Sequence, residues 1–228
     1  MVAVINLDSG SSIISEQKLL ILRSEVLKWF AVNCRAFLWR YSSDPYHIFI
    51  AEILLRQTQA TRVTKPYLEL VTRYPNVQSL SEANIAELRI WFKPLGLITR
   101  ANHLVQAAQI VVGKHGGNFP NDIANLSMLP GIGIYGARAI LCLGFGESYP
   151  MVDEGSGRVL RRVLSMAAKG PAYCDSNLLK IAESIVPEQF PKEFNLGLID
   201  IAAACCHPRE PSCVKCPLVD VCSHRQYE

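Results

Sequence analysis

The sequence predicts an all-α fold, and three observations carry this prediction. Apolar residues recur at helical spacing along most of the 228-residue chain, and capping residues, Gly, Pro or Asn separate these stretches. Convincing alternation of apolar and polar residues, the mark of strands, is absent. Half of the residues are apolar and 19% are charged, which is enough to bury a substantial core as one unit or two small lobes.

The expected helices follow one another along the chain. Residues 15–40 carry a wide apolar stripe that indicates the first helix. Asp44 and Pro45 are a helix N-cap and a proline at the first helical position, and the following YHIFIAEILL is apolar nearly all round, so this helix should be deeply buried. Further helices are expected at roughly 60–73, 81–93, 100–114 and 121–127, and then in YGARAILCLGF (135–145) and GRVLRRVLSM (157–166).

Composition and charge indicate a cytoplasmic protein that does not enter membranes. No apolar run is long enough to cross a bilayer, and the first residues lack the basic start and apolar middle of a secretory signal. The formal net charge of +3 permits nucleic acid as a partner without requiring it.

Four of the eight cysteines form a regular cluster near the end of the sequence. Cys206, Cys213, Cys216 and Cys222 are spaced C-x6-C-x2-C-x5-C. Four soft thiolate ligands suit either zinc or an iron–sulfur cluster. The long first interval and the asymmetry fit a loop around an object larger than a single ion, although spacing alone does not exclude zinc. Cys205 lies outside this spacing, so we expect it to be a buried neighbour.

The segment Leu129-Pro-Gly131-Ile-Gly133 lies between a short helix and a long one. Two glycines in a turn at a helix N-terminus let backbone N–H groups approach a DNA phosphate closely. An ordinary helix–helix turn also favours Pro and Gly, and the pentapeptide alone is equally consistent with both.

Asp153 and Glu52 are carboxylates in contrasting settings. Asp153 precedes a helical run and is expected to be an N-cap, a setting that also keeps a carboxylate ionised and able to stabilise a cationic sugar or activate water. Glu52 lies among apolar residues, where burial favours the protonated form and proton donation. Alternatively, Glu52 forms an i, i+4 ion pair with Arg56.

Taken together, these motifs resemble the helix-hairpin-helix DNA glycosylase superfamily, which includes endonuclease III, the adenine glycosylase MutY and the mismatch-specific Mig enzymes. The likeness covers about residues 44–223, through DPYHIFIAEILLRQTQ, LPGIG, the Met-Val-Asp at 151–153 and NLGLIDIAAACC before the cysteine cluster. Several independent motifs in the right order make the resemblance specific.

The resemblance implies a six-helix barrel lobe at 37–148 and an iron–sulfur lobe made of 1–36 and 149–228. It implies a [4Fe–4S] cluster on Cys206, Cys213, Cys216 and Cys222. It also implies that DNA is bound with the target base flipped into a pocket, with Asp153 as the essential aspartate and Glu52 contacting that base.

Tyr135 decides which branch of the superfamily the chain resembles. Endonuclease III carries there the lysine that attacks the sugar, whereas Mig-type enzymes carry tyrosine, which has no amine for a Schiff base. Leu97 stands where endonuclease III or Mig has an aliphatic wedge and MutY an aromatic one. The sequence ends six residues after Cys222, so we do not expect the second domain with which MutY reads 8-oxoguanine.

The resulting hypothesis is a monomeric, monofunctional glycosylase that removes thymine or uracil mispaired with guanine in double-stranded DNA. Leu129, Gly131 and Gly133 contact DNA, Gln57 and Leu97 fill the gap left by the flipped base, and Asp153, Glu52 and Tyr135 are catalytic. Two features depart from Mig: RQTQ at 56–59 is closer to MutY, and Gly155 replaces the usual Asn or His. An adenine glycosylase and a catalytically inactive mismatch-binding relative therefore remain alternatives.

Overall fold

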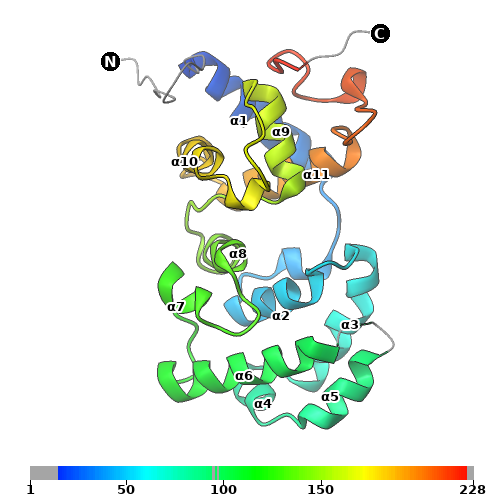
Figure 1. The fold of residues 1–228 in the computed structure, drawn as a ribbon, viewed down its shortest axis with the longest axis vertical. Helices are drawn as coiled ribbons and strands as arrows, with labels where there is room; N and C mark the ends of the chain where they lie inside the picture. The colour runs from blue at the N-terminus through cyan, green and yellow to red at the C-terminus, as the bar shows by residue number, and fades with distance from the viewer. Residues whose placement is uncertain (1–14, 94–95, 97, 225–228) are drawn as a thin grey trace. The chain divides into compact units, whose positions relative to one another are not determined.

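The computed structural model describes residues 15–93, 96 and 98–224, and within these residues every regular element is a helix and none is a strand (Figure 1). This confirms the all-α prediction. The chain divides into two compact units, one formed by Met1–Arg35 with Glu147–Glu228 and the other by Ala36–Gly146. No helix in the described ranges is both long enough and apolar enough to cross a membrane.

The unit Ala36–Gly146 is built around a buried helix, as its apolar sequence predicted. The Asp44 side chain caps this helix by accepting the N–H of Tyr46 at 2.9 Å, and Pro45 is its first residue. Seven of its eleven residues are buried, because neighbouring helices cover it on several sides. This helix, α2 (Pro45–Leu55), packs against α3 (Ala60–Arg73), α6 (Ile98–His115) and α8 (Ile134–Phe145), as Figure 1 shows.

The expected helix at 81–93 is wrong in its first part, because two short helices replace it. The Asn84 side chain accepts the N–H groups of Ala86 and Glu87 and so starts a new helix. The unit is completed by η1 (Leu38–Tyr41), α4 (Val77–Ser81), α5 (Ile85–Phe92) and α7 (Ile123–Ser127).

The other unit joins the N-terminal helix to the C-terminal part of the chain. Helix α1 (Glu16–Asn33) ends earlier than its apolar stripe suggested, and the Arg35 backbone N–H and guanidinium beyond it both donate to the buried Asp200. Helix α11 (Pro191–Ala204) packs against α1 and against α9 (Glu154–Leu164). The remaining elements are η3 (Ala172–Cys174), α10 (Ser176–Ile185) and η4 (Cys213–Lys215).

A glycine sets how closely α1 and α11 approach. A Cβ atom built on Gly197 of α11 would lie 2.7 Å from Val26 Cγ1 of α1, a distance that real Cβ atoms do not show. Val26 is fully buried as a result. The two helices therefore pack backbone to side chain at this point, and the core of this unit extends from there to α9 and α10.

Candidate functional site

Asp153 is the N-cap of α9, as the sequence predicted, and it is held more firmly than a simple cap requires. Its Oδ1 accepts the Ser156 N–H at 2.6 Å and lies 2.9 Å from the Ser156 hydroxyl. In return, the Asp153 N–H donates to Ser156 Oγ at 2.9 Å, which completes a capping box. This reciprocal pair fixes the half-buried carboxylate at the positive end of the helix dipole.

The unusual residues that follow Asp153 have a packing reason. Glu154 Oε1 accepts the N–H of Ala172 at 2.9 Å and so anchors η3. A Cβ on Gly155 would lie 3.1 Å from Ala202 Cβ and 3.2 Å from Asp153 Oδ1, and a Cβ on Gly157 would lie 2.3 Å from Ala172 Cβ. Two glycines in a first turn lower helix propensity, but here they let α9 approach α11 and η3 closely.

Glu52 and Tyr135 lie in the other unit, on the packed pair α2 and α8. Glu52 is half-buried rather than fully buried, although the residues on either side of it are core. Tyr135 is half-buried in the first turn of α8. The Arg56 guanidinium donates to the Gly131 carbonyl oxygen at 3.0 Å and thereby joins the end of α2 to the LPGIG hairpin.

The two glycines of the LPGIG hairpin have different roles. Gly131 has a φ of 83°, and a Cβ there would lie 2.6 Å from Ile53 Cδ1 and 3.0 Å from His103 Cβ, so the backbone is pressed onto α2 and α6. Gly133 is exposed, caps α8 without a side chain, and has open space around its Cα. The first N–H groups of a helix have no partner within it, so this end of α8 can receive an anion.

Leu129 does not have the surface position that a DNA-contacting side chain needs. Its side chain is 2% exposed and belongs to the core, while its carbonyl oxygen accepts the N–H of Ile132 at 2.9 Å. The Leu129 side chain therefore belongs to the core, and contact of Leu129 with DNA stays a prediction. Leu97, the predicted wedge, lies outside the described residues.

Gln57 is exposed in the turn between α2 and α3, and its φ of 52° places a non-glycine residue in the left-handed region. Such a conformation persists where the surroundings impose it, and strained residues of this kind cluster at active sites and switch regions. The neighbouring backbone is held by Arg100 of α6, which donates to the Leu54 carbonyl oxygen at 2.6 Å and to Thr58 Oγ1 at 3.1 Å. Sequence reasoning missed Arg100, because these contacts span more than 40 residues of the chain.

The four regularly spaced cysteines line one pocket in the unit that contains α9 and α11. Cys206, Cys213, Cys216 and Cys222 all line it, no carboxylate does, and Arg162 Nη1 donates to Cys206 Sγ at 3.3 Å. Burial raises the pKa of the Cys216 thiol to about 12, so a thiolate there requires a compensating positive charge. Within the described residues, no three Cys, His, Asp or Glu are arranged to hold a single ion. The donor set fits a thiolate-bound iron–sulfur cluster.

Cys205 also lines this pocket but has a different partner. It is 5% exposed, as expected for a buried neighbour, and its thiol donates to the Lys215 carbonyl oxygen at 3.6 Å. This contact links the end of α11 to η4, which begins at Cys213 and is followed directly by Cys216.

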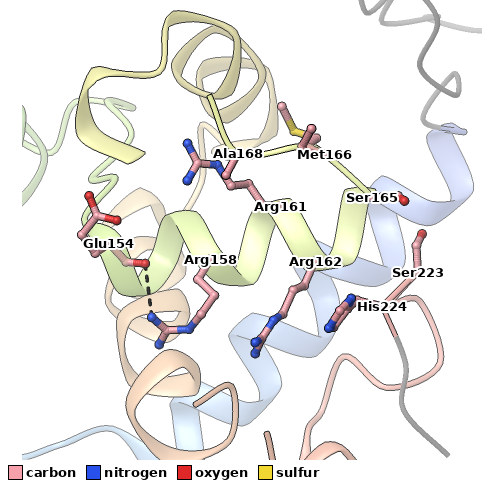
Figure 2. A pocket seen from close by; sticks show the side chains of 10 residues that line it. Glu154, Arg158, Arg161, Arg162, Ser165, Met166, Ala168, Ser223 and His224 are labelled. Carbon is pink, nitrogen blue, oxygen red and sulfur yellow. Dashed lines mark hydrogen bonds between the residues drawn. The ribbon is translucent and has the colours of Figure 1, made fainter. Parts of the chain in front are cut away.

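Two of the three arginines of α9, Arg158 and Arg162, bind the backbone of the cysteine segment instead of forming a solvated face. Arg158 Nε donates to the Cys206 carbonyl oxygen at 2.7 Å, and Arg162 donates to the His207 and Pro208 carbonyl oxygens at 2.7 and 2.8 Å. Figure 2 shows both side chains extending from the same side of α9, with Arg161 on another side. These groups and His224 line one pocket, and their donors tie α9 to the segment 206–208.

Comparison with known proteins agrees with this arrangement. Residues 50–184 match the HhH-GPD superfamily of base excision DNA repair proteins. The chain is 37% identical to a thymine-DNA glycosylase of Aeropyrum pernix over 88% of this chain and 92% of that protein. It is 35% identical to a thymine/uracil-DNA glycosylase of Methanothermobacter thermautotrophicus, over 92% and 96%.

Solved structures give the same result at the level of the fold. The structure of a thermostable thymine-DNA glycosylase superposes with a TM-score of 0.86 at 35% identity, covering 91% of this chain and 96% of the other. The family match covers more than half of the chain, and the likeness to these relatives extends over nearly its whole length. The chain therefore belongs to the HhH-GPD superfamily of base excision DNA repair proteins.

Proposed function

We propose that the protein is a monofunctional DNA glycosylase that excises thymine or uracil mispaired with guanine from double-stranded DNA. The observation that carries this proposal is its likeness to two thymine-processing glycosylases over 92% and 96% of their lengths. We further propose that it works as a cytoplasmic monomer on nucleoid DNA.

In this proposal, the unit Ala36–Gly146 provides contacts to the DNA backbone and fills the space left by the flipped base. The backbone at Gly131 and Gly133 binds a phosphate, supported by the start of α8, where the N-cap Gly133 provides no side-chain hydrogen bond. Gln57 fills the space left when the mispaired base leaves the stack, supported by its exposure and its imposed left-handed backbone. A mispaired base costs less to flip than a paired one, which contributes to selectivity.

Excision itself is hydrolysis of the bond between C1′ of the sugar and the base nitrogen. The Asp153 carboxylate stabilises the positive charge that develops on the sugar as that bond breaks. Tyr135 and Glu52 hold the flipped base, and Glu52 or a water supplies the proton with which it departs. Water then forms the new bond to C1′ and leaves an abasic site.

Tyr135 is the basis for proposing that the strand itself is not cut. Cleavage by β-elimination needs an amine that forms a Schiff base with C1′, and a phenol cannot do so. The expected product is therefore an intact strand with an abasic site that breaks only in alkali. Replacing Tyr135 by Lys tests whether an amine at this position is sufficient to confer strand cleavage.

The four cysteines lining one pocket support a resident [4Fe–4S] cluster. When bound, the cluster supplies four iron–thiolate bonds that tie Cys206, Cys213, Cys216 and Cys222 into a single structure, and no step of the reaction passes through it. Iron and acid-labile sulfide analysis tests this directly. We expect Cys222→Ser to lose iron and Cys205→Ser to retain it, and equal iron contents in the two variants would contradict the ligand assignment.

The experiment that tests the function is excision on labelled duplexes containing G·T, G·U, G·A and 8-oxoguanine·A, each developed with and without alkali. Alkali-dependent breaks at T or U are the expected result. Breaks at A would identify an adenine glycosylase, and breaks without alkali would overturn the reading of Tyr135. Absence of excision by iron-replete protein would identify a binding protein without glycosylase activity.

A further inference from the structure

The turn between α2 and α3 is held from one side by a single guanidinium group. Arg100 in the first turn of α6 donates to the carbonyl oxygens of Leu54 and Arg56 and to the Thr58 hydroxyl. All three acceptors lie within five residues of one another in the chain. Gln57 stands between the last two of them, with its side chain exposed.

The carbonyl groups that Arg100 binds lie at the C-terminal end of a helix. Leu54 lies in the last turn of α2 and Arg56 is its C-cap, so the helix leaves their oxygens without the N–H partners found in its interior. These oxygens also carry the negative end of the helix dipole, which a cation stabilises. In many helices a glycine in the left-handed conformation follows the C-cap, and it lets backbone N–H groups pair with the last carbonyl oxygens. Here Gln57 occupies that position.

A glutamine in this position needs an external restraint. Its φ of 52° is uncommon for a residue with a Cβ, and the bonds from Arg100 fix the residues before and after it. Thr58 N–H also donates to the Leu55 carbonyl oxygen at 3.1 Å, which closes the turn. The Gln57 side chain is thus exposed to solvent while hydrogen bonds on both sides hold its backbone conformation.

A second arginine connects this turn to the hairpin. Arg56 Nη1 donates to the Gly131 carbonyl oxygen at 3.0 Å. Gly131 itself lies so close to Ile53 and His103 that even a Cβ would not fit, so the hairpin backbone packs directly on α2 and α6. The position of Gln57 is therefore fixed relative to the backbone that binds phosphate in the proposed function.

We propose that Arg100 is a positioning residue for base flipping, which preorganises Gln57 to enter the duplex. The proposal rests on the proposed function, because it assigns to Gln57 the filling of the vacated space. Because the turn is already ordered before DNA binds, no further conformational entropy has to be lost there when the base flips. Arg100 itself need not touch DNA, since it acts through the backbone on both sides of Gln57.

The test compares Arg100→Met, which keeps the aliphatic length, with Arg100→Lys and with the control Arg89→Met on exposed α5 of the same unit. The first measurement is hydrogen exchange of the peptide covering 55–59 in the free protein. The second is fluorescence of 2-aminopurine placed beside the mispaired base, which reports flipping on binding and does not require excision. Thr58→Val is a milder variant, which removes one acceptor should Arg100→Met fail to fold.

We expect Arg100→Met to speed exchange of this peptide about tenfold and to lower the flipped fraction at saturating protein by a similar factor, since bonds from a charged donor are lost. Arg100→Lys should fall between it and the wild type, and Arg89→Met should match the wild type. In a Gln57→Ala background, Arg100→Met should have little further effect on flipping.

Unchanged exchange, or a flipping defect of equal size with and without Gln57, would overturn the inference. Its failure is distinct from failure of the proposed function. If the wild type flips the base but excises nothing, the glycosylase assignment fails while the comparison of variants still decides the role of Arg100.

Discussion

Asp153 has two roles in the structure and the proposed mechanism, and substitution can separate them. Its Oδ1 caps α9 through the Ser156 N–H at 2.6 Å, and its charge is assigned to the sugar during excision. Asparagine keeps an oxygen at the same place and is as good a cap. The free energy of unfolding of Asp153→Asn should therefore lie within about 0.5 kcal/mol of that of the wild type. Alanine removes the cap, and Asp153→Ala should be less stable by about 1 kcal/mol, or roughly 2–4 °C in Tm for a chain of this size.

Excision should respond differently, because both substitutions remove the charge. Loss of a preorganised electrostatic group typically slows catalysis by roughly 100- to 1000-fold, and we expect at least the lower figure for both variants. The assay is single-turnover excision from a G·T or G·U duplex, with urea unfolding and duplex binding measured on the same preparations. Full excision by Asp153→Asn would refute the proposed mechanism, and equal destabilisation by both variants would refute the cap argument.

Two further predictions follow from packing and charge. Gly157→Ala should destabilise the protein by roughly 1–2 kcal/mol in urea unfolding, because its Cβ would meet Ala172 Cβ at 2.3 Å. The control Gly113→Ala, on the exposed surface of α6, should stabilise the protein by about 0.5–1 kcal/mol. If Gly157→Ala left stability unchanged, the packing argument would be contradicted. Burial alone would raise the pKa of Asp175, but its bonds to Arg161 and to the Leu178 N–H hold that pKa below the ordinary value of 3.8. A carboxylate with a lowered pKa in the folded state stabilises it fully above the unfolded pKa and loses this effect as pH falls through the folded value. The stability advantage of wild type over Asp175→Asn should therefore be constant above about pH 5 and shrink below about pH 4, and an advantage that persists undiminished at pH 2 would argue against the shift.

Local signals in the sequence explain which parts of the fold could be predicted. Asp44 and Pro45 mark the start of α2 with contacts only two residues apart, and the N-cap role of Asp153 likewise needs only the residues next to it. Asn84 is a residue type that favours N-caps, but apolar residues on both sides of it hid the break before α5. Its bonds to Ala86 and Glu87 identify it as the cap.

Contacts between distant segments explain what could not be predicted. The bonds of Arg158 and Arg162 to the cysteine segment join residues more than 40 positions apart, so on sequence alone these side chains suit a solvated helix face equally well. Leu129 was assigned to DNA because it belongs to the hairpin motif, but membership of a motif does not say which side chains face the core. Arg100 carried no local signal at all, because its acceptors lie more than 40 residues away, at the end of α2 and in the turn that follows it.

The close packing of α1 on α11 at Gly197 also bears on how the chain is made. Val26 emerges from the ribosome early, but the helix that covers it is completed about 170 residues later, which at typical synthesis rates is a delay on the order of 10–30 s. The unit Ala36–Gly146 is continuous in sequence and can complete its core during that interval. The apolar stripe of α1 therefore has to stay soluble or be shielded until α11 has been synthesised, and truncation before α11 would leave it permanently uncovered.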